Sequence, residues 1–290
     1  SRQDVVDNIY EQMAAILASG KVSYVKWDMN RSITECWSHA LPAARQGEVF
    51  HRYILVLYDL YERLTTAFPH VLFESCASGG NRFDPGMLYY APQAWTSDNS
   101  DAVERQKIQY GTSMCYPMSS MGSHVSVVPN HQVNRVTPLH TRANTAYFGT
   151  FGYELDLGKL SAEEIAEVKD EIAFMKEYRE IFQFGTFYRL QSPFEHNVMA
   201  WMCVSGDQKT AIVGWYRTLN RVNDRFARVR LAGLLPDTLY EDSRSGARCY
   251  GDELMHYGLI TTDGTTGEPH PEDGLTTDFD SRLYVLNAVE

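Results

Sequence analysis

Hydrophobic side chains recur at helical spacing in three long segments of the chain. The first runs from Gln3 to Ala18, the second from about Glu48 to Ala67, and the third from Ala162 to Phe182. Spacing of three and four residues places these side chains on one face, so each segment is predicted to form an amphipathic helix. Ser161 and Glu164, at the start of the third segment, form a capping-box pattern that is typical of a helix N-terminus.

Short runs of β-forming residues stand between the predicted helices. Val22–Asp28, Val71–Phe73 and a run that ends at Trp95 are each followed by polar residues and then by a helical or loop segment. Weaker strand candidates lie near Met118–Val128 and Ala146–Tyr153. Strand, polar loop and helix therefore alternate up to about residue 182, which is typical of βα units around a parallel sheet.

The pattern changes from about residue 186 onward. Short alternating runs appear there, separated by turn-rich pieces: Val198–Val204, Thr210–Tyr216, Arg228–Leu231 and Arg282–Val289. This spacing predicts a small antiparallel β domain, and the polar segment Thr261–Thr277 is predicted to be a surface loop. We therefore expect one domain over residues 1–185 and a second over residues 186–290.

Composition and charge exclude several classes of function. The chain has 290 residues, with 26 Lys and Arg against 37 Asp and Glu, and a net charge of −11. Nucleic acid is not an expected partner, because a phosphate-binding surface needs clustered basic side chains. Nor is a membrane, because no stretch approaches the roughly 18 apolar residues of a membrane span. The five cysteines are few and odd in number, which favours a reducing compartment, so we predict a cytoplasmic location.

Two carboxylates stand where predicted strands end. Asp28 closes the first β-like run and Asp98 follows the third. The carboxyl ends of barrel strands meet in one pocket, so these two side chains are expected to converge. Two convergent carboxylates are the minimum for glycoside hydrolysis, in which one attacks or activates water and the other protonates the leaving oxygen. The alternatives are a helix-capping role for Asp98 and a turn role for Asp28.

Other polar residues accompany these carboxylates. Lys26 shares a strand face with Asp28, where its charge would keep the carboxylate ionised or its ammonium would donate to a sugar hydroxyl; an ordinary ion pair is the alternative. The glycine-rich segment Cys76–Arg82 lacks the spacing of a P-loop or dinucleotide fingerprint. Gly79 is therefore expected either in a close backbone approach to a ligand or in a tight turn. The histidines and cysteines lack metal-ligand spacing, so no metal is expected. Hydrolysis by two carboxylates needs no cofactor either, so none is expected.

Three segments taken together resemble the α-galactosidases of glycoside hydrolase family 36. They are Tyr24–Arg31, Cys76–Met87 and Trp95–Ala102. Shorter similar stretches are Ile108–Ser113, Phe148–Leu155 and Ser281–Leu286. The resemblance therefore covers nearly the whole chain, in order.

The resemblance implies a role for each motif residue. Asp28 falls on the nucleophile and Asp98 on the general acid/base of a retaining exo-α-galactosidase, which would hydrolyse terminal α-linked galactose from oligosaccharides such as raffinose and melibiose. Substrate contacts are implied for Lys26, Trp27, Met29, Asn30, Cys76, Gly79 and Arg82. Retention predicts carboxyl groups about 5–5.5 Å apart. A galactosyltransferase, an α-N-acetylgalactosaminidase and an inert carbohydrate-binding fragment are the alternatives.

The resemblance also implies the architecture. The fold would be α/β, with strands four to eight of a (β/α)8 TIM barrel followed by a C-terminal antiparallel β-sandwich. The family's N-terminal β-sandwich and first three barrel strands have no counterpart in the sequence. Because five strands cannot close a barrel, we expect this chain to be a segment of a longer polypeptide that requires the missing N-terminal part. A homo-oligomer, often a tetramer in relatives, is expected as well.

Overall fold

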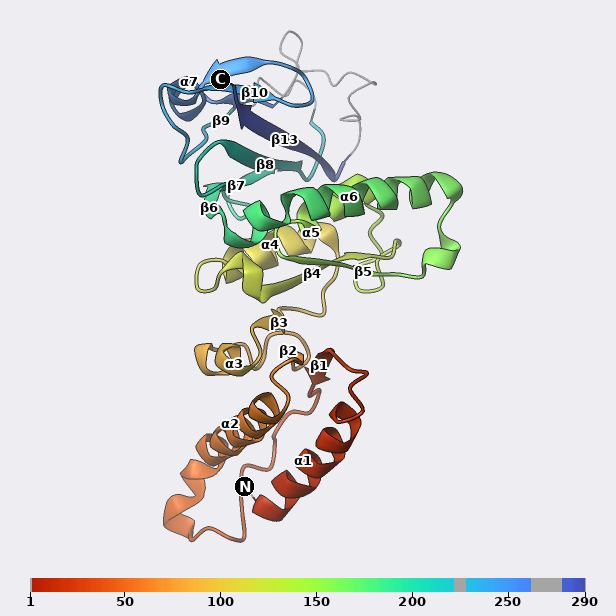
Figure 1. Cartoon of the computed structure of the whole chain (residues 1–290), viewed down its shortest axis with the longest axis vertical. Coiled ribbons are helices and arrows are strands. Elements are labelled where there is room, and N and C mark those ends of the chain that lie inside the picture. The colour runs from red at the N-terminus through yellow and green to blue at the C-terminus, as the bar shows by residue number, and fades with distance from the viewer. Residues whose placement is uncertain (1, 222–227, 262–277, 290) are drawn as a thin grey trace. The chain divides into compact units, whose positions relative to one another are not determined.

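A computed structural model describes residues 2–221, 228–261 and 278–289. The chain divides into two compact units, unit 1 (Ser1–Asp98) and unit 2 (Asn99–Glu290) (Figure 1). Most of the predicted surface loop, residues 262–277, lies outside the described residues. No helix among the described residues is long and apolar enough to cross a membrane.

Unit 1 alternates helices and parallel strands. Strand β1 pairs in parallel with β2, and β2 pairs in parallel with β3. The elements follow in the order α1 (Gln3–Leu17), β1 (Tyr24–Asp28), a 3-10 helix (Ala43–Glu48), α2 (Val49–Ala67), β2 (Leu72–Cys76), α3 (Pro85–Tyr90) and β3 (Gln93–Trp95). The predicted first two helices and the strands are thus present, whereas the short helix α3 was not expected.

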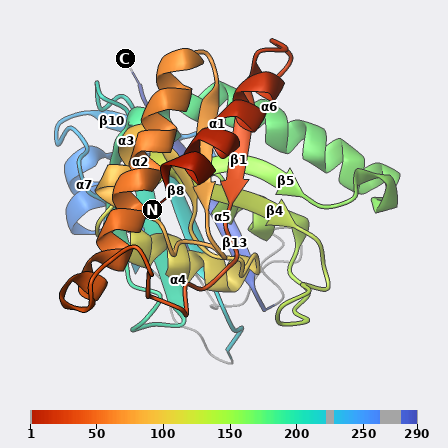
Figure 2. The ribbon, with the colours of Figure 1, turned by 90° about the horizontal axis from the view of Figure 1, so that it is seen from below.

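The core of unit 1 lies between the helices and one face of the strands. Helices α1 and α2 lie side by side (Figure 2), and Tyr61 and Leu64 of α2 are fully buried with Phe73 of β2. Successive side chains of a strand point to opposite faces, so Val25 and Trp27 pack against this core. Lys26 and Asp28 therefore belong to the other face of β1.

The first part of unit 2 again alternates helices and parallel strands. Its elements are α4 (Ala102–Thr112), β4 (Met121–Ser126), α5 (Leu139–Ala146), β5 (Thr150–Glu154) and α6 (Ala162–Phe184). Strands β4 and β5 pair in parallel. The predicted capping box is present: the Glu164 N–H donates to the Ser161 hydroxyl, and the Ser161 N–H donates to the Glu164 carboxylate. The strand expected from Ala146 begins only at Thr150, because Ala146 ends helix α5.

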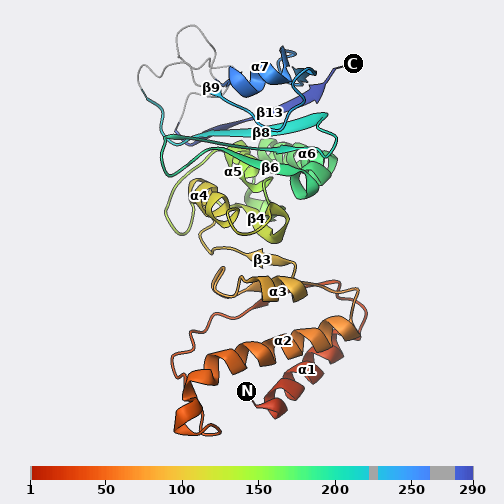
Figure 3. The same ribbon diagram turned by 90° about the vertical axis from the view of Figure 1, so that its left-hand side faces the viewer.

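The second part of unit 2 is an antiparallel β domain. Its main sheet has the order β11-β10-β13-β8-β7-β6. Figure 3 shows three of these strands, β13, β8 and β6, one below another. The strands are β6 (Thr186–Gln191), β7 (Val198–Val204), β8 (Thr210–Arg217), β10 (Leu239–Asp242), β11 (Arg248–Tyr250) and β13 (Asp280–Ala288). A second layer consists of β9 (Arg228–Val229), β12 (Leu259–Ile260) and α7 (Gly251–His256). Trp215, Tyr240 and Leu254 belong to the core between the two layers.

The other face of the main sheet packs on the helices of the parallel part. The Trp201 ring of β7 lies 5.0 Å from the Phe148 ring, and the Tyr216 hydroxyl of β8 donates to the Asn144 carbonyl of α5. This shared core explains why unit 2 extends across residues 185 and 186. The predicted domain boundary there, between the end of α6 and the start of β6, stays a prediction.

Candidate active site

Asp28 is the last residue of β1, and hydrogen bonds surround its carboxylate. Asn30 Nδ2 donates to Asp28 Oδ2 at 2.7 Å. The Cys76 thiol and the backbone N–H groups of Met29 and Ser78 also donate to it. Burial raises the pKa of Asp28, but together these hydrogen bonds outweigh burial and hold that pKa below its ordinary value. The carboxylate is therefore kept ionised, which is the state that a nucleophile requires.

Cys76 ends strand β2 at the register position opposite Asp28. Its side chain is buried, and burial raises the pKa of the thiol to about 11. The thiol is therefore protonated near neutral pH, so it serves as a hydrogen-bond donor to Asp28 and is not itself a nucleophile.

Lys26 forms the ion pair that the sequence offered as an alternative, with Glu74 as its partner. Its Nζ atom lies 3.5 Å from Glu74 Oε1 and 4.7 Å from the centre of the Trp95 ring. Hydrogen bonds, and not the Lys26 charge, are the largest influences that lower the pKa of Asp28. Sequence reasoning missed Glu74, although it alternates with Cys76 along β2 and so faces the same side.

The loop that follows β2 touches the segments of both aspartates. Asn30 Oδ1 accepts a hydrogen bond from the Ser78 N–H at 2.8 Å. Gly79 has a φ of +82°, and a Cβ at this position would lie 2.8 Å from Ser97 Cα and 3.2 Å from Asp98 N. Both the conformation and the close approach require glycine, which confirms the predicted tight turn. The turn places the Asp98 backbone against the loop that holds Asn30.

Asp98 follows β3 and has an exposed side chain. Its Oδ1 atom accepts a hydrogen bond from Trp95 Nε1 at 3.1 Å. The alternative that Asp98 caps the next helix is wrong, because Asp101 is the N-cap of α4 and accepts from the Glu104 N–H at 3.0 Å. The side chain of Asp98 is therefore not committed to capping. The predicted separation of the two carboxyl groups stays a prediction.

Trp27 and Met29, two of the predicted substrate-binding residues, contact α2 instead. The Trp27 ring centre is 5.2 Å from that of Tyr61. Met29 Sδ accepts a hydrogen bond from the Tyr53 hydroxyl at 2.9 Å. Both side chains therefore pack against α2, and their predicted substrate contact stays a prediction.

Arg82 is buried and holds backbone atoms next to Asp28. Its Nη2 atom donates to the Trp27 carbonyl at 3.0 Å and to the Cys76 carbonyl at 2.5 Å. The Cys76 carbonyl also accepts the Met29 N–H at 3.0 Å. Arg82 thus fixes the peptide groups on both sides of the carboxylate. Its predicted substrate contact stays a prediction.

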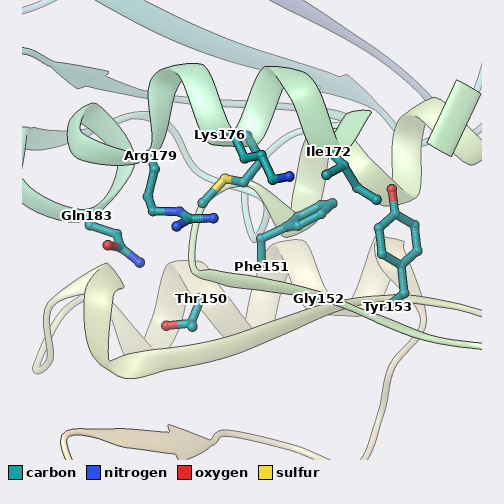
Figure 4. Close-up of a pocket in the computed structure, with 9 residues that line it drawn as sticks. Thr150, Phe151, Gly152, Tyr153, Ile172, Lys176, Arg179 and Gln183 are labelled. Atoms are coloured by element: carbon teal, nitrogen blue, oxygen red, sulfur yellow. The ribbon is translucent and has the colours of Figure 1, made fainter. Parts of the chain in front are cut away.

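Two cavities of about 440 Å³ each occur in the described residues, one in each unit. The cavity of unit 1 lies between α1, α2 and the end of β1, and apolar side chains line most of it. Its lining includes Trp27, Asp28, Met29 and Arg82. The cavity of unit 2 lies between β5 and α6, where Lys176 and Arg179 reach over Phe151 (Figure 4). None of the predicted site residues lines this second cavity.

No metal centre is formed by the described residues. Within them, no group of three or more His, Cys, Asp or Glu side chains is placed to hold a metal ion. His124 Nδ1 lies 3.5 Å from Glu154 Oε2, and His140 Nε2 lies 2.7 Å from Asp280 Oδ1.

The site around Asp28 and Asp98 offers an ionised carboxylate, a second exposed carboxylate and several hydrogen-bond donors. This set of groups suits acid–base and nucleophilic chemistry.

Two family models match the chain. Residues 1–185 match the melibiase model, and residues 198–286 match the model of the glycosyl hydrolase family 36 C-terminal domain. These matches, with parallel βα units followed by an antiparallel β domain, place the chain in a glycoside hydrolase family of the barrel class. The chain belongs to glycoside hydrolase family 36, as the sequence motifs predicted.

Relatives with curated names are α-galactosidases. AgaA of Geobacillus stearothermophilus is 52% identical over 290 residues, which is 100% of this chain and 38% of AgaA. Mel36A of Lactobacillus acidophilus is 49% identical over 258 residues, which is 89% of this chain and 35% of Mel36A. The chain therefore spans little more than a third of the length of these relatives.

Solved structures of the family confirm the predicted fold class. The crystal structure of AgaA matches with a TM-score of 0.92 and 52% identity, over 99% of this chain and 38% of AgaA. The α-galactosidase of Lactobacillus brevis matches with a TM-score of 0.93 and 49% identity, over 100% of this chain and 38% of that protein. Substituted forms of AgaA have been crystallised with raffinose and with stachyose.

Proposed function

We propose that the complete polypeptide carrying this chain is a retaining exo-α-galactosidase. Asp28 is the nucleophile and Asp98 is the general acid/base. The observation that carries the proposal is the set of hydrogen bonds that keeps the Asp28 carboxylate ionised at the end of a parallel strand. The substrates are oligosaccharides with a terminal α-linked galactose, such as raffinose and melibiose.

The substitutions in the AgaA complexes support this choice of residues. The raffinose complex and the stachyose complex each replace an aspartate, and the two replaced positions are 70 residues apart in AgaA. Asp28 and Asp98 are separated by the same 70 residues. A glycosidase with both carboxylates intact would cleave a bound substrate, so the replaced pair in AgaA is the expected counterpart of Asp28 and Asp98.

The proposed reaction has two displacement steps. In the first, a carboxylate oxygen of Asp28 attacks the anomeric carbon while the glycosidic C–O bond breaks. The electron pair of that bond stays on the leaving oxygen, which takes the proton from Asp98. In the second, water attacks the same carbon, Asp98 takes a proton from the water, and Asp28 leaves as a carboxylate. Two inversions at one carbon give net retention.

The proposed galactose contacts lie beside the nucleophile. Lys26 lies on the same face of β1 as Asp28. Asn30 and Cys76 both donate hydrogen bonds to the Asp28 carboxylate. Gly79 lets the loop backbone approach the Asp98 segment closely. These four residues retain the substrate-binding role implied by the motifs.

Substitution of the nucleophile tests the proposal. In the complete polypeptide, Asp28→Ala should lower the hydrolysis of nitrophenyl α-galactoside by several orders of magnitude. Azide should restore turnover and give the β-galactosyl azide, identified by NMR, because the small anion replaces the missing carboxylate. Asp84→Ala is the matched control, since Asp84 caps α3 and accepts from the Met87 N–H. Substantial hydrolysis by Asp28→Ala without azide would remove Asp28 from its role.

Assembly and location are further predictions. A homo-oligomer, with a tetramer as the expected form, can be tested by sedimentation of the complete polypeptide. The cytoplasmic location predicted from cysteine usage can be tested by cell fractionation.

A further inference from the structure

Glu74 is a buried carboxylate beside the proposed active site, and the two displacement steps do not use it. Only 3% of its side chain is exposed. Its Oε2 atom accepts a hydrogen bond from the Tyr24 hydroxyl, and its Oε1 atom lies 3.5 Å from Lys26 Nζ. The parallel register of β1 and β2 places Glu74 directly opposite Lys26.

The charge of Glu74 needs compensation, and Lys26 provides it. A buried carboxylate without a partner is strongly unfavourable. Among the described residues, Glu74 Oε1 has no hydrogen-bond partner within the usual limits. The ammonium of Lys26 is therefore the cation that offsets this charge, and in turn the carboxylate restrains the ammonium.

Trp95 restrains the Lys26 ammonium from another side. Lys26 Nζ lies 4.7 Å from the centre of the Trp95 ring, within the range of a cation–π contact. Trp95 also donates from Nε1 to Asp98 Oδ1 at 3.1 Å. A chain of contacts thus runs from Glu74 through Lys26 and Trp95 to the proposed general acid/base.

We propose that Glu74 is a positioning residue, which holds the Lys26 ammonium in place to bind a galactose hydroxyl without touching the sugar itself. This inference rests on the proposed function, because it takes Lys26 as a galactose contact. A free lysine side chain samples many rotamers, and restraining it before binding removes an entropic cost that the substrate would otherwise meet. Nothing in the sequence motifs assigns this task to Glu74.

A double-mutant cycle in the complete polypeptide tests the proposal. Lys26→Met, Glu74→Gln and the double variant are compared for kcat/KM on nitrophenyl α-galactoside and for the inhibition constant of free galactose. Glu74→Gln alone should lower kcat/KM by roughly 10- to 100-fold, the range for loss of one partner of a charged group. In the Lys26→Met background, the same change should cost less than about threefold, because Glu74 acts through Lys26.

The outcomes separate the proposal from its alternatives. An equal factor in both backgrounds would mean that Glu74 has an independent, structural effect, and it would overturn the proposal. If Glu74→Gln does not fold, as judged by its thermal unfolding, the cycle is run with Glu74→Asp. In that variant the carboxylate remains buried, but its side chain is one methylene shorter and so lies farther from Lys26. The fall in kcat/KM is again compared between the two backgrounds, and an equal factor in both would overturn the proposal. If the unsubstituted polypeptide releases no galactose, the proposed function fails, which is a separate result.

Discussion

Asn30 provides the sharpest test of how the chain controls its proposed nucleophile. Its amide nitrogen donates to Asp28 Oδ2 at 2.7 Å, and its amide oxygen accepts the Ser78 N–H at 2.8 Å. Asn30→Ala removes the donor to the carboxylate and the acceptor for the loop in a single change. Because hydrogen bonds from Asn30 and its neighbours hold the pKa of Asp28 below its ordinary value, losing one of them should raise that pKa.

The size of the effect follows from the exposure of the carboxylate. A hydrogen bond to a charged group contributes about 1.5–3 kcal/mol, but water can replace part of this one because the Asp28 side chain is exposed. We therefore expect a loss of about 1 kcal/mol, which is roughly a fivefold fall in kcat/KM. The nucleophile works only when ionised, so activity disappears as the pH falls through its pKa. The acid limb of the pH profile should consequently move upward by roughly half to one pH unit.

The assay is the dependence of kcat/KM on pH for the complete polypeptide and the Asn30→Ala variant. Asn81→Ala is the matched control, because Asn81 lies in the same loop and donates to the Ala77 carbonyl at 2.8 Å. The control should leave the acid limb where it is. An acid limb that stays fixed in Asn30→Ala, or moves to lower pH, would refute the reasoning about Asp28.

Three further predictions follow from the geometry of single residues. Gly79→Ala places a Cβ 2.8 Å from Ser97 Cα, so it should lower kcat/KM more than tenfold. Gly20→Ala is the control, because Gly20 has a φ of +68° but open space around it, and it should leave kcat/KM unchanged. Equal kcat/KM values for the two variants would contradict the tight-turn argument. Arg82→Ala should lose activity about tenfold and recover part of it in guanidinium salts, because the side chain acts as a backbone clamp; no recovery at any salt concentration would argue against the clamp. Burial raises the pKa of Glu171 to about 7, so the native state favours its protonated form and loses stability as the pH rises through that value. Calorimetry should show a smaller fall in unfolding temperature between pH 5 and pH 8 for Glu171→Gln than for the unsubstituted protein, and equal falls would exclude Glu171 as the cause.

Local signals in the sequence predicted most of the elements, because they depend on neighbouring residues. Strand β7 has the predicted bounds, Val198–Val204, and α6 begins at the predicted capping box. Helix α5 was missed because it has no amphipathic stripe. Its polar residues Thr141 and Arg142 are buried, and they form hydrogen bonds that the sequence does not reveal. Thr141 accepts from the Ser281 hydroxyl, and Arg142 Nη1 donates to the Ser126 carbonyl.

The sequence by itself determined the family, the order of βα units and the two candidate carboxylates, since motif spacing and strand ends are properties of consecutive residues. Only the tertiary structure decided which partners these residues meet. Trp27 and Met29 contact α2, and Lys26 forms an ion pair with Glu74. The Asp28 carboxylate accepts hydrogen bonds from Asn30 and Cys76. The physical reason is that most of these contacts join segments that are distant in the sequence. The pairs Lys26–Glu74 and Asp28–Cys76 depend on the register between β1 and β2, which no local pattern specifies.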